Sequence, residues 1–497
     1  MKAQNRYDVI IIGGGIHGTG VAAEAASRGL SVLLCEKDDL ASGASSRTTS
    51  LISGGLNRLE KLELDLVRKS FQEQAILRKR APHLLRHLSF YIPVVPALRP
   101  KRKLKAGILL YNSLRPAESR KFLQNRQRLP SEDKLAADKL KPAFQDVLAY
   151  DDCSINDSRL VVSNALLAKK LGAEILTRVA VKKAYRQKDH WQVTLSSDQV
   201  FECKALVNAS GADINTLLAK ALPNQSRCVP QLVRGDQIIV PKLYKGYYGF
   251  LLQMHDGQAI YTLPYKRDYT LIGSVEQLWT PELEVHEAFS MQAIDTLCLT
   301  VNDYFNQQIT ADDVVKHSWA VRTVYDDTET NPQRMSYDTV LDLDCPDGHS
   351  PLVNIFGGRL TTYRLASRQV MDVLRPYTRA EKTPGFSESF LPGGDIIDGS
   401  MNNFVNELQV AYPWLDEEPR WRYARLYGSL THQILQNCMN ANDMGHHYGH
   451  HLYQCEVNYL KEHEWAKSAD DILWRRTRLG IVFNEAETQN LQKNFNN

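Results

Sequence analysis

The chain has 497 residues, of which 43% are hydrophobic, and this is enough to bury large cores in two or three domains. Its formal net charge of +3 and isoelectric point near 8.3 are too mild to indicate general nucleic-acid binding. The eight cysteines show neither a Cys-x-x-Cys pair nor a regular spacing, which argues against a zinc site or a disulfide framework and favours a reducing cytoplasm.

The first forty residues predict a strand, a glycine turn, a helix and a second strand. An apolar run leads into Gly13-Gly14-Gly15-Ile16-His17-Gly18, and a second apolar run ends at Glu36. Gly13 allows a tight turn, Gly15 lets the backbone approach a pyrophosphate, and Gly18 lets the helix pack closely on the sheet. Glu36 stands where a carboxylate can accept hydrogen bonds from both ribose hydroxyls. The pattern predicts a dinucleotide with an unphosphorylated ribose, such as FAD or NAD. The alternative is an ordinary glycine-rich turn.

The rest of the chain favours FAD over NAD. Flavoenzymes that take electrons from NAD(P)H often carry a second nucleotide fingerprint, and this chain contains no other Gly-x-Gly-x-x-Gly. We therefore expect one tightly held FAD, reduced directly by a small molecule.

A loop rich in hydroxyl side chains follows the second strand, over residues 41–50. Small hydroxyl residues can donate hydrogen bonds to phosphate or flavin oxygens, whereas the alternative is a plain solvent loop. The candidate cofactor contacts in this loop are Ser45, Ser46, Thr48 and Thr49.

A strongly basic segment spans residues 99–128, with ten Lys or Arg residues and a single acid, Glu118. Its core, residues 99–105, precedes the apolar run 108–111. Basic residues beside a short apolar stretch suit contact with anionic lipid, and a solvated basic surface is an equal alternative. RNA binding is disfavoured, because no stacking motif accompanies the charges. The first apolar run is the cofactor strand rather than a secretory signal. No segment approaches the ~20 apolar residues of a spanning helix. Any membrane contact through 99–111 is therefore expected to be peripheral.

Residues 150–211 predict a return to a Rossmann-like FAD-binding domain. A helical pattern near residues 159–171 is followed by apolar strand patterns that include 174–179 and 205–211. Val179 and Gly211, near the ends of these strands, join the candidate cofactor contacts.

The remaining segments complete a mixed α/β fold of three parts. Closely spaced strand patterns over residues 228–276 indicate an antiparallel sheet that faces the substrate. A breaker-rich stretch over 381–394 precedes a C-terminal domain that reads as helical throughout. The expected division is 1–80, 145–225 and 320–380 for the FAD-binding domain, 81–144 and 226–319 for the substrate-binding cap domain, and 385–497 for the helical C-terminal domain.

A second glycine turn, Gly357-Gly358-Arg359-Leu360-Thr361-Thr362, offers positive charge for the flavin. A flavin that oxidises an alcohol needs such charge near its N1 position to stabilise the reduced anion. The helix N-terminus and the Arg359 guanidinium can supply it, and Gly358, Leu360 and Thr361 are candidate cofactor contacts. An ordinary strand-to-helix turn is the alternative.

These motifs together resemble one family, the FAD-dependent glycerol-3-phosphate dehydrogenases and oxidases, whose fold is that of the glycine-oxidase-like flavoproteins. The resemblance runs nearly from end to end of the chain. It is carried by Gly13-Gly14-Gly15-Ile16 with Glu36, Ser53-Gly54-Gly55-Leu56, Leu206-Val207-Asn208-Ala209-Ser210-Gly211, Phe356 to Arg364, Leu391-Pro392-Gly393-Gly394 and the C-terminal segment from Tyr459 to Thr477.

The resemblance implies oxidation of sn-glycerol 3-phosphate to dihydroxyacetone phosphate by hydride transfer to flavin N5. Electrons would pass to a quinone at the membrane surface in a dehydrogenase, or to oxygen in an oxidase. Arg322 matches the family arginine that meets the substrate phosphate, and Arg359 stands where the family has a lysine beside the flavin. The resulting expectation is a cytoplasmic protein, peripheral on the cytoplasmic face of the membrane, with a homodimer as a further hypothesis.

Several substrate-site positions depart from the family pattern. The family's His-Gly-Gly-Leu-Arg-Tyr is replaced by Ser53-Gly54-Gly55-Leu56-Asn57-Arg58, so a histidine that could accept the hydroxyl proton is absent. The family's Gly-Ser-His is replaced by Gly235-Asp236-Gln237, so a second such histidine is absent too. A second phosphate-facing arginine of the family is replaced by Tyr337, and further departures are Pro264-Tyr265 and Gly273-Ser274-Val275-Glu276.

The candidate substrate residues are therefore Arg322, Arg359, Ser53 and Arg58, the last replacing a lost positive charge. His255 and His317 are candidate proton acceptors by residue type, although a structural role is favoured for each. The alternative functions are a related flavoenzyme with another small anionic hydroxy substrate, and a flavin-binding protein that has lost turnover.

A histidine cluster, Gly445-His446-His447-Tyr448-Gly449-His450-His451, could share a metal if it were helical. No acid or cysteine completes a ligand set, and the cluster lies away from the flavin loops. We therefore predict no metal site.

Overall fold

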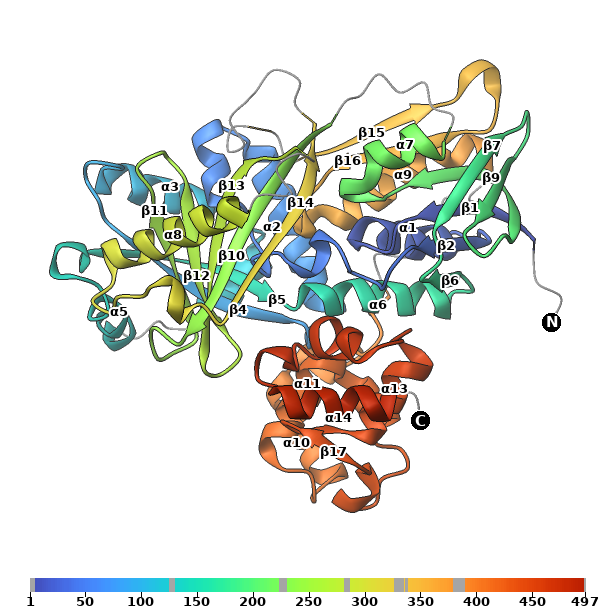
Figure 1. The fold of residues 1–497 in the computed structure, drawn as a ribbon. Helices are drawn as coiled ribbons and strands as arrows, with labels where there is room; N and C mark the ends of the chain where they lie inside the picture. The colour runs from blue at the N-terminus through green and yellow to red at the C-terminus, as the bar shows by residue number, and fades with distance from the viewer. Residues whose placement is uncertain are drawn as a thin grey trace.

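A computed structural model describes residues 5–124, 130–222, 230–280, 287–325, 335, 338–378 and 389–495. Figure 1 shows three parts: one sheet built around the N-terminal strand, a second sheet beside it, and a C-terminal domain packed below the junction of the two. The seven cysteines within these ranges are all free thiols.

The first sheet is the predicted Rossmann-like one. Its strand order is β15-β16-β9-β1-β2-β6, with parallel pairing from β16 to β6 and with β15 antiparallel at the edge, while the β7–β8 hairpin extends from β9. The strands are β1 (Arg6–Ile12), β2 (Val32–Glu36), β6 (Glu174–Thr177), β7 (Val181–Arg186), β8 (Trp191–Leu195), β9 (Val200–Asn208), β15 (Thr339–Asp344) and β16 (Leu352–Gly357).

Alternate residues of β1 serve two separate cores, as the period of two along a strand requires. Val9 and Ile11 pack in a core with three helices, α1 (Ile16–Ser27), α6 (Asp157–Lys170) and α9 (Tyr363–Thr378). Ile10 and Ile12 face the opposite side, where the β7–β8 hairpin contributes the fully buried Trp191. The first sheet is therefore covered on both faces.

The second sheet has the order β14-β10-β13-β12-β11-β4-β5-β3, and all its pairs are antiparallel except β4 with β11. Helix α8 (Glu287–Tyr304) covers one face, while α2 (Leu64–Arg80) and α3 (Lys101–Ser113) cover the other. The strands are β3 (Leu51–Ile52), β4 (Leu85–Pro93), β5 (Val147–Ile155), β10 (Gln231–Pro241), β11 (Tyr248–Gln253), β12 (Ala259–Tyr265), β13 (Tyr269–Leu278) and β14 (Lys316–Val324). The chain also forms three short helices, α4 (Ala117–Gln124), α5 (Pro130–Ala137) and α7 (Ile214–Lys220).

Three strands of the second sheet come from ranges that the sequence assigns to the FAD-binding domain. They are β3, β5 and most of β14, and all three hydrogen-bond within the second sheet. Their residue patterns reveal a strand but not its partner, because pairing over such long separations is set by tertiary packing.

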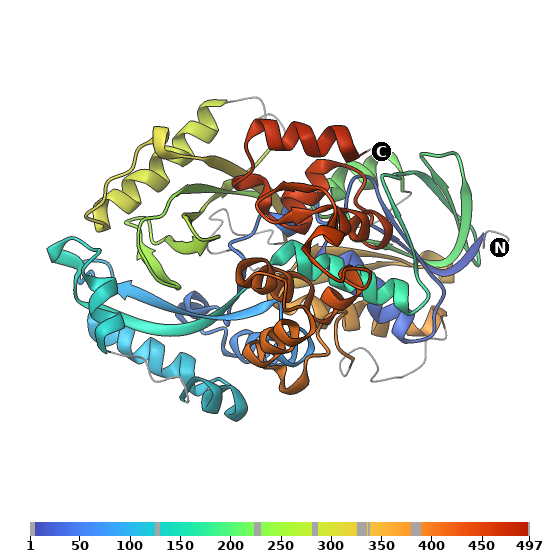
Figure 2. The ribbon, with the colours of Figure 1, turned by 90° about the horizontal axis from the view of Figure 1, so that it is seen from below.

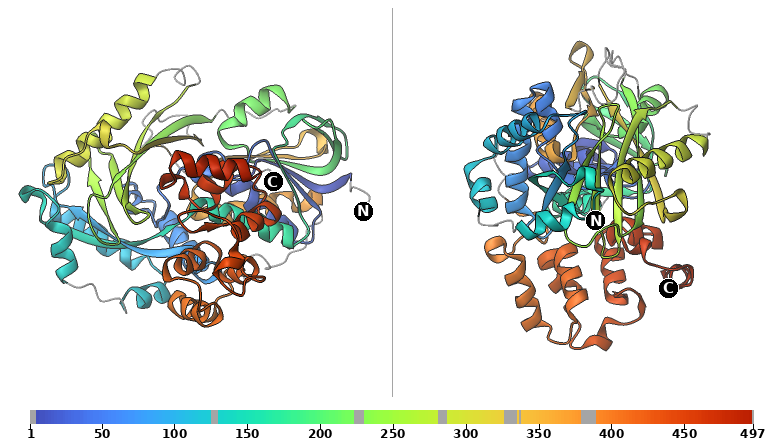
Figure 3. Two further views of the ribbon diagram at one scale, coloured as in Figure 1. Left: turned by 60° about the horizontal axis from the view of Figure 1, so that its bottom comes forward. Right: turned by 90° about the vertical axis from the view of Figure 1, so that its left-hand side faces the viewer.

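The C-terminal domain has a hydrophobic core of its own and consists mainly of helices (Figures 2 and 3). They are α10 (Met401–Ala411), α11 (Glu417–Tyr427), α12 (Thr431–Ile434), α13 (Gln454–His463) and α14 (Glu485–Phe495). The expectation of helix throughout is wrong at one place, where β17 (His447–Gly449) and β18 (Leu452–Tyr453) form a small hairpin. Of the breaker-rich stretch 381–394, residues 381–388 lie outside the described ranges.

The hairpin also changes the reading of the histidine cluster. His447 lies on β17 and His450 and His451 lie in the following turn, with positive φ, so the spacing is not that of one helix face. Within the described ranges, no group of three or more His, Cys, Asp or Glu side chains has a metal-binding arrangement. No helix in the same ranges is long and apolar enough to span a bilayer.

The core of the first sheet yields a stability prediction. Leu34, in the middle of β2, has no exposed surface, so Leu34→Ala should lower the free energy of unfolding by about 2–5 kcal/mol through lost burial and a residual cavity. Leu171, just after α6, is 42% exposed, and Leu171→Ala should change the free energy of unfolding by no more than about 0.5 kcal/mol. Urea titration measures both, and equal losses would contradict this assignment of the core.

Candidate functional site

A cavity of about 1870 Å³ lies between the two sheets. The first sheet contributes the carboxyl ends of its parallel strands, including the turn after β1 and the end of β2. The second sheet contributes residues of β10, β12, β13 and β14. Ligands of open α/β sheets bind at the carboxyl ends of the strands, so this is the expected position for a dinucleotide.

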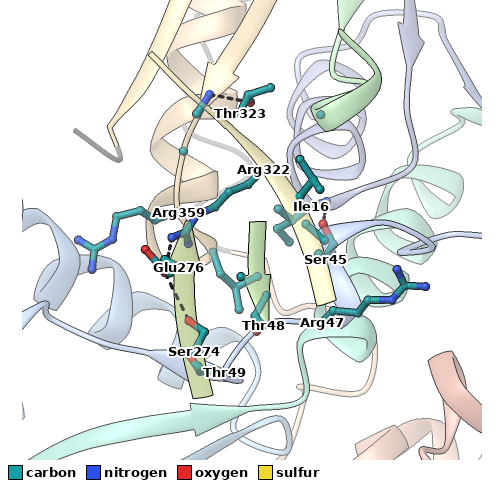
Figure 4. Close-up of a pocket in the computed structure, with 18 of the residues that line it drawn as sticks. Ile16, Ser45, Arg47, Thr48, Thr49, Ser274, Glu276, Arg322, Thr323 and Arg359 are labelled. Atoms are coloured by element: carbon teal, nitrogen blue, oxygen red, sulfur yellow. Dashed lines mark hydrogen bonds and ion pairs between the residues drawn. The ribbon is translucent and has the colours of Figure 1, made fainter. Parts of the chain in front are cut away.

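The glycine turn brings the N-terminus of α1 to the cavity wall. Gly13 has φ +111°, which a residue with a side chain rarely adopts. A Cβ on Gly18 would lie 1.8 Å from the Gly13 carbonyl oxygen, so only glycine lets the helix pack this closely on the turn. Gly13 and Gly15 line the cavity, while Gly18 has the packing role expected for it. The first helix amide, that of Ile16, donates to Ser45 Oγ at 3.0 Å (Figure 4).

The Glu36 carboxylate is fixed at the same end of the cavity. Its two oxygens accept hydrogen bonds from the Gly14 amide at 2.5 Å and the Asp38 amide at 2.8 Å. Glu36 is 7% exposed, and this burial raises its pKa above the ordinary value. A carboxylate anchored by backbone amides at a cavity wall is preorganised to accept further hydrogen bonds from ribose hydroxyls.

The hydroxyl-rich loop lies against the cavity only in part. Ser45, Thr48 and Thr49 line it, as does Gly211 after β9, whereas Ser46 does not. Val179 also lies off the cavity, where its amide donates to the Glu36 carbonyl at 2.8 Å, while its neighbour Ala180 is a lining residue.

The second glycine turn meets the cavity beside the first. Gly357 and Gly358 have φ of +66° and +97°, and Gly358, Arg359, Leu360 and Thr361 line the cavity. The Arg359 guanidinium lies 3.5 Å from Ser70 Oγ. Burial, and then the positive charge of Arg58, lower the pKa of Arg359. Two guanidinium groups therefore lie near each other on this side of the cavity.

Arg322 reaches from β14 into the cavity and pairs with Glu276 on β13 (Figure 4). Ser274 Oγ lies 3.4 Å from the same carboxylate. The arginine predicted to bind an anionic substrate therefore already contacts a carboxylate, which the sequence reading did not anticipate.

Ser53 and Arg58, the other two candidate substrate residues, are both held by the protein. Ser53 Oγ donates to Asp152 Oδ2 at 2.8 Å and accepts from the Gly55 amide at 2.9 Å. Asp152 also accepts hydrogen bonds from Tyr111 and Gln74, and its burial raises its pKa. Arg58 is 4% exposed and contacts the Met335 carbonyl and Glu63. Both residues line the cavity, but their polar atoms already form hydrogen bonds or ion pairs with other residues of the protein.

Neither candidate histidine from the sequence lies at the cavity. His255 is exposed in the turn after β11, and His317 bonds Asp236 at 2.8 Å. Tyr337, the substituted phosphate-facing position, lies outside the described residues.

His17, inside the first glycine motif, was missed as a site residue. It lines the cavity, and its Nε2 is buried without a hydrogen-bond partner in the described ranges. Burial lowers its pKa to about 4, so the imidazole is neutral at pH 7. Its place in the glycine motif was the signal that could have identified it.

The cavity fits FAD by its own geometry. Four of its features match the parts of a dinucleotide with a redox ring. They are a turn in which an added Cβ would clash, a carboxylate anchored at one end, a His17 nitrogen without a partner, and a turn that carries a guanidinium. The fold and the site together define a FAD-dependent oxidoreductase.

Comparison with known proteins gives the family. The family described as FAD dependent oxidoreductase matches residues 8–364, and the C-terminal domain of alpha-glycerophosphate oxidase matches residues 387–494. The chain belongs to the family of FAD-dependent glycerol-3-phosphate dehydrogenases and oxidases, FAD is its cofactor, and the predicted family and fold class are confirmed.

Individual relatives cover nearly the whole chain. A glycerol-3-phosphate dehydrogenase of Pseudomonas aeruginosa is 37% identical over 97% of this chain and 93% of its own length. A D-erythritol 1-phosphate dehydrogenase of Brucella abortus is 36% identical over 100% of this chain and 99% of its own length. The crystal structure of the glycerol-3-phosphate dehydrogenase from Bacillus halodurans with FAD has a TM-score of 0.73 at 21% identity, covering 100% of this chain and 94% of that one.

The clash at Gly18 predicts the effect of adding one methyl group. Gly18→Ala should leave the purified protein with less than about a tenth of the wild-type FAD, because the helix must move away from the turn that is predicted to bind the diphosphate. Gly107→Ala on α3 is the control, since an added Cβ there meets nothing within 4 Å. The ratio of flavin to protein absorbance measures both, and full FAD content in Gly18→Ala would contradict the role of this contact.

Proposed function

We propose that this protein oxidises sn-glycerol 3-phosphate to dihydroxyacetone phosphate and passes the electrons to a quinone. The observation that carries the proposal is the Arg322 guanidinium, which reaches into the FAD cavity from the second sheet. A planar guanidinium suits the bidentate binding of a phosphate. The names of the curated relatives support a phosphorylated polyol as the substrate.

In this proposal, Arg322, Arg359 and Glu276 each have a separate role. Arg322 binds the anionic end of the substrate, and Arg359 keeps positive charge beside the glycine turn. When bound, FAD supplies the two-electron acceptor that takes the hydride from the carbinol carbon. The hydroxyl proton passes to the Glu276 carboxylate, the base in this proposal, which stands beside Arg322 in the cavity. An incoming phosphate must share Arg322 with Glu276 or displace it.

A second candidate substrate is a longer phosphorylated polyol such as D-erythritol 1-phosphate. It is favoured by the amide side chains that replace an arginine and a histidine of the family pattern in this half of the cavity, namely Asn57 and Gln237, both of which line it. The Brucella abortus relative supports the same substrate class.

Anaerobic mixing with each substrate tests these proposals. We expect sn-glycerol 3-phosphate to bleach the flavin absorbance band within the mixing experiment. Bleaching only by D-erythritol 1-phosphate would support the second candidate and exclude the first. A flavin that neither compound reduces would contradict both and favour a flavin-binding protein without turnover.

The Arg322–Glu276 pair predicts opposite effects of two substitutions. Arg322→Ala should raise KM for the anionic substrate tenfold or more, because a charged hydrogen bond contributes about 1.5–3 kcal/mol. Glu276→Gln should lower KM several-fold by removing the competing carboxylate, and it should lower kcat about 100-fold or more by removing the base. Arg68→Ala, which breaks an exposed ion pair with Asp65 on α2, is the control. A raised KM in Glu276→Gln would show that this carboxylate binds substrate rather than competing with it.

Helix α3 is the proposed contact with the membrane and the quinone. Leu109 and Leu110 are 71% and 40% exposed on this helix, and Arg102 and Lys105 are exposed beside them. Other residues of α3, including Leu104 and Ile108, line the cavity, so a lipid-borne acceptor at α3 would be close to its mouth. Apolar side chains flanked by cations suit an anionic lipid surface. A cytoplasmic location and a homodimer stay predictions.

Vesicle sedimentation tests this surface. The wild-type protein should sediment with vesicles of anionic lipid, and Leu109→Asp should abolish most of this binding. Val410→Asp is the matched control, because Val410 is 84% exposed on α10 of the C-terminal domain. A wild-type protein that stays in the supernatant at both low and high salt would contradict the proposal.

A further inference from the structure

The C-terminal domain contacts the cofactor loops through three arginines close together in sequence, Arg475, Arg476 and Arg478, which we call the arginine clasp. They belong to or directly follow the π-helical segment Asp471–Arg476. The hydrophobic core of the domain is built from its own residues, whereas the clasp crosses to the first part of the chain. The coupling between the two parts at this point is therefore ionic.

The first anchor of the clasp is Asp39, three residues after Glu36. Arg476 binds Asp39 with two hydrogen bonds of 2.7 and 2.8 Å, and Arg475 Nε donates to the same carboxylate at 2.6 Å. Asp39 and Arg476 are 1% and 0% exposed. Just beyond Asp39, the Ala41 amide donates to the Gly14 carbonyl at 3.1 Å. The clasp therefore fixes the segment that joins Glu36 to the hydroxyl-rich loop.

The second anchor is Asp157, at the start of α6. Arg478 pairs with Asp157 Oδ1 and donates to Ser50 Oγ at 3.1 Å. The other oxygen of Asp157 accepts from the Thr48 amide at 3.2 Å and from Thr48 Oγ1 at 2.7 Å. Asp157 has no exposed surface. Arg478 thus holds the far end of the same loop.

We propose that the arginine clasp is a positioning device for FAD, which holds the loop between Asp39 and Ser50 at both ends so that its middle stays closed on the cofactor. Residues 42–45, 47, 48 and 49 line the cavity between the two anchors, and Ser45 contacts the N-terminus of α1. Removal of one partner from a buried guanidinium–carboxylate pair is strongly destabilising, because it leaves the other charge buried without compensation. The inference concerns cofactor retention and does not depend on which substrate is oxidised.

The alternative is that these pairs only hold the C-terminal domain in place. A matched control separates the two, because the same junction contains an ion pair that does not bind the loop. Arg178 pairs with Asp471 at 2.8 Å, and Asp471 keeps Arg475 as a second partner. Arg178→Gln therefore weakens the junction without releasing either anchor.

The experiment measures FAD release from the holoenzyme on dilution, by the rise of free-flavin fluorescence, with thermal unfolding recorded in parallel. Arg478→Gln should raise the Kd for FAD at least tenfold, which is about 1.4 kcal/mol. Ser50→Ala, which removes only one contact of the clasp, should raise it by less, and Arg478→Lys should restore part of the affinity. Arg178→Gln should leave the Kd within about threefold of wild type.

Two results would overturn the proposal: a Kd within threefold of wild type in Arg478→Gln, or an equal loss of affinity in Arg178→Gln. If Arg478→Gln fails to fold, Ser50→Ala and Arg478→Lys decide the question. An unchanged Kd in both would overturn the proposal, and a Kd raised more than threefold in either, with Arg178→Gln within threefold of wild type, would support it.

Discussion

The contact between Gly18 and the Gly13 carbonyl is the constraint on which the site depends. Because no side chain fits between them, α1 begins against the turn after β1, and its first amide donates to Ser45 at the cavity wall. The same turn supplies the Gly14 amide that anchors Glu36. One close approach of helix to strand thus positions both the N-terminus of α1, where we predict the diphosphate, and Glu36, where we predict the ribose.

The second sheet forms the other wall of the cavity, where the proposed substrate residues lie. Its strands β14 and β13 carry Arg322 and Glu276, which pair with each other and line the same cavity as Arg359. In the proposed function, an anionic substrate must therefore compete with the Glu276 carboxylate for Arg322. The buried Asp152 accepts hydrogen bonds from Ser53 Oγ and from the Gly54 amide, so Ser53 helps to build the wall of the cavity.

Local signals in the sequence were sufficient for the cofactor half of the site. The glycine turn, the acid after β2 and the second glycine turn each follow from rules that act within about forty residues, and Gly13, Gly15, Glu36, Gly358 and Arg359 all lie at the cavity. Ser46 and Val179 do not, because position in a loop or strand does not fix the direction of a side chain. The placement of β5 and β14 and the pairing of Arg322 with Glu276 depend on contacts between distant segments, which no local pattern reports. The links from Arg478 to Asp157 and from Arg476 to Asp39 span more than 300 residues of sequence, and only the folded chain reveals them.

An experimental structure of the protein with FAD and a non-reacting analogue of glycerol 3-phosphate tests the central claim most directly. The account predicts the diphosphate at the N-terminus of α1, the ribose on Glu36, the flavin ring beside Arg359 and the phosphate of the analogue on Arg322. A flavin ring placed away from the Gly357–Arg359 turn, or an analogue bound without contact to Arg322, would contradict it.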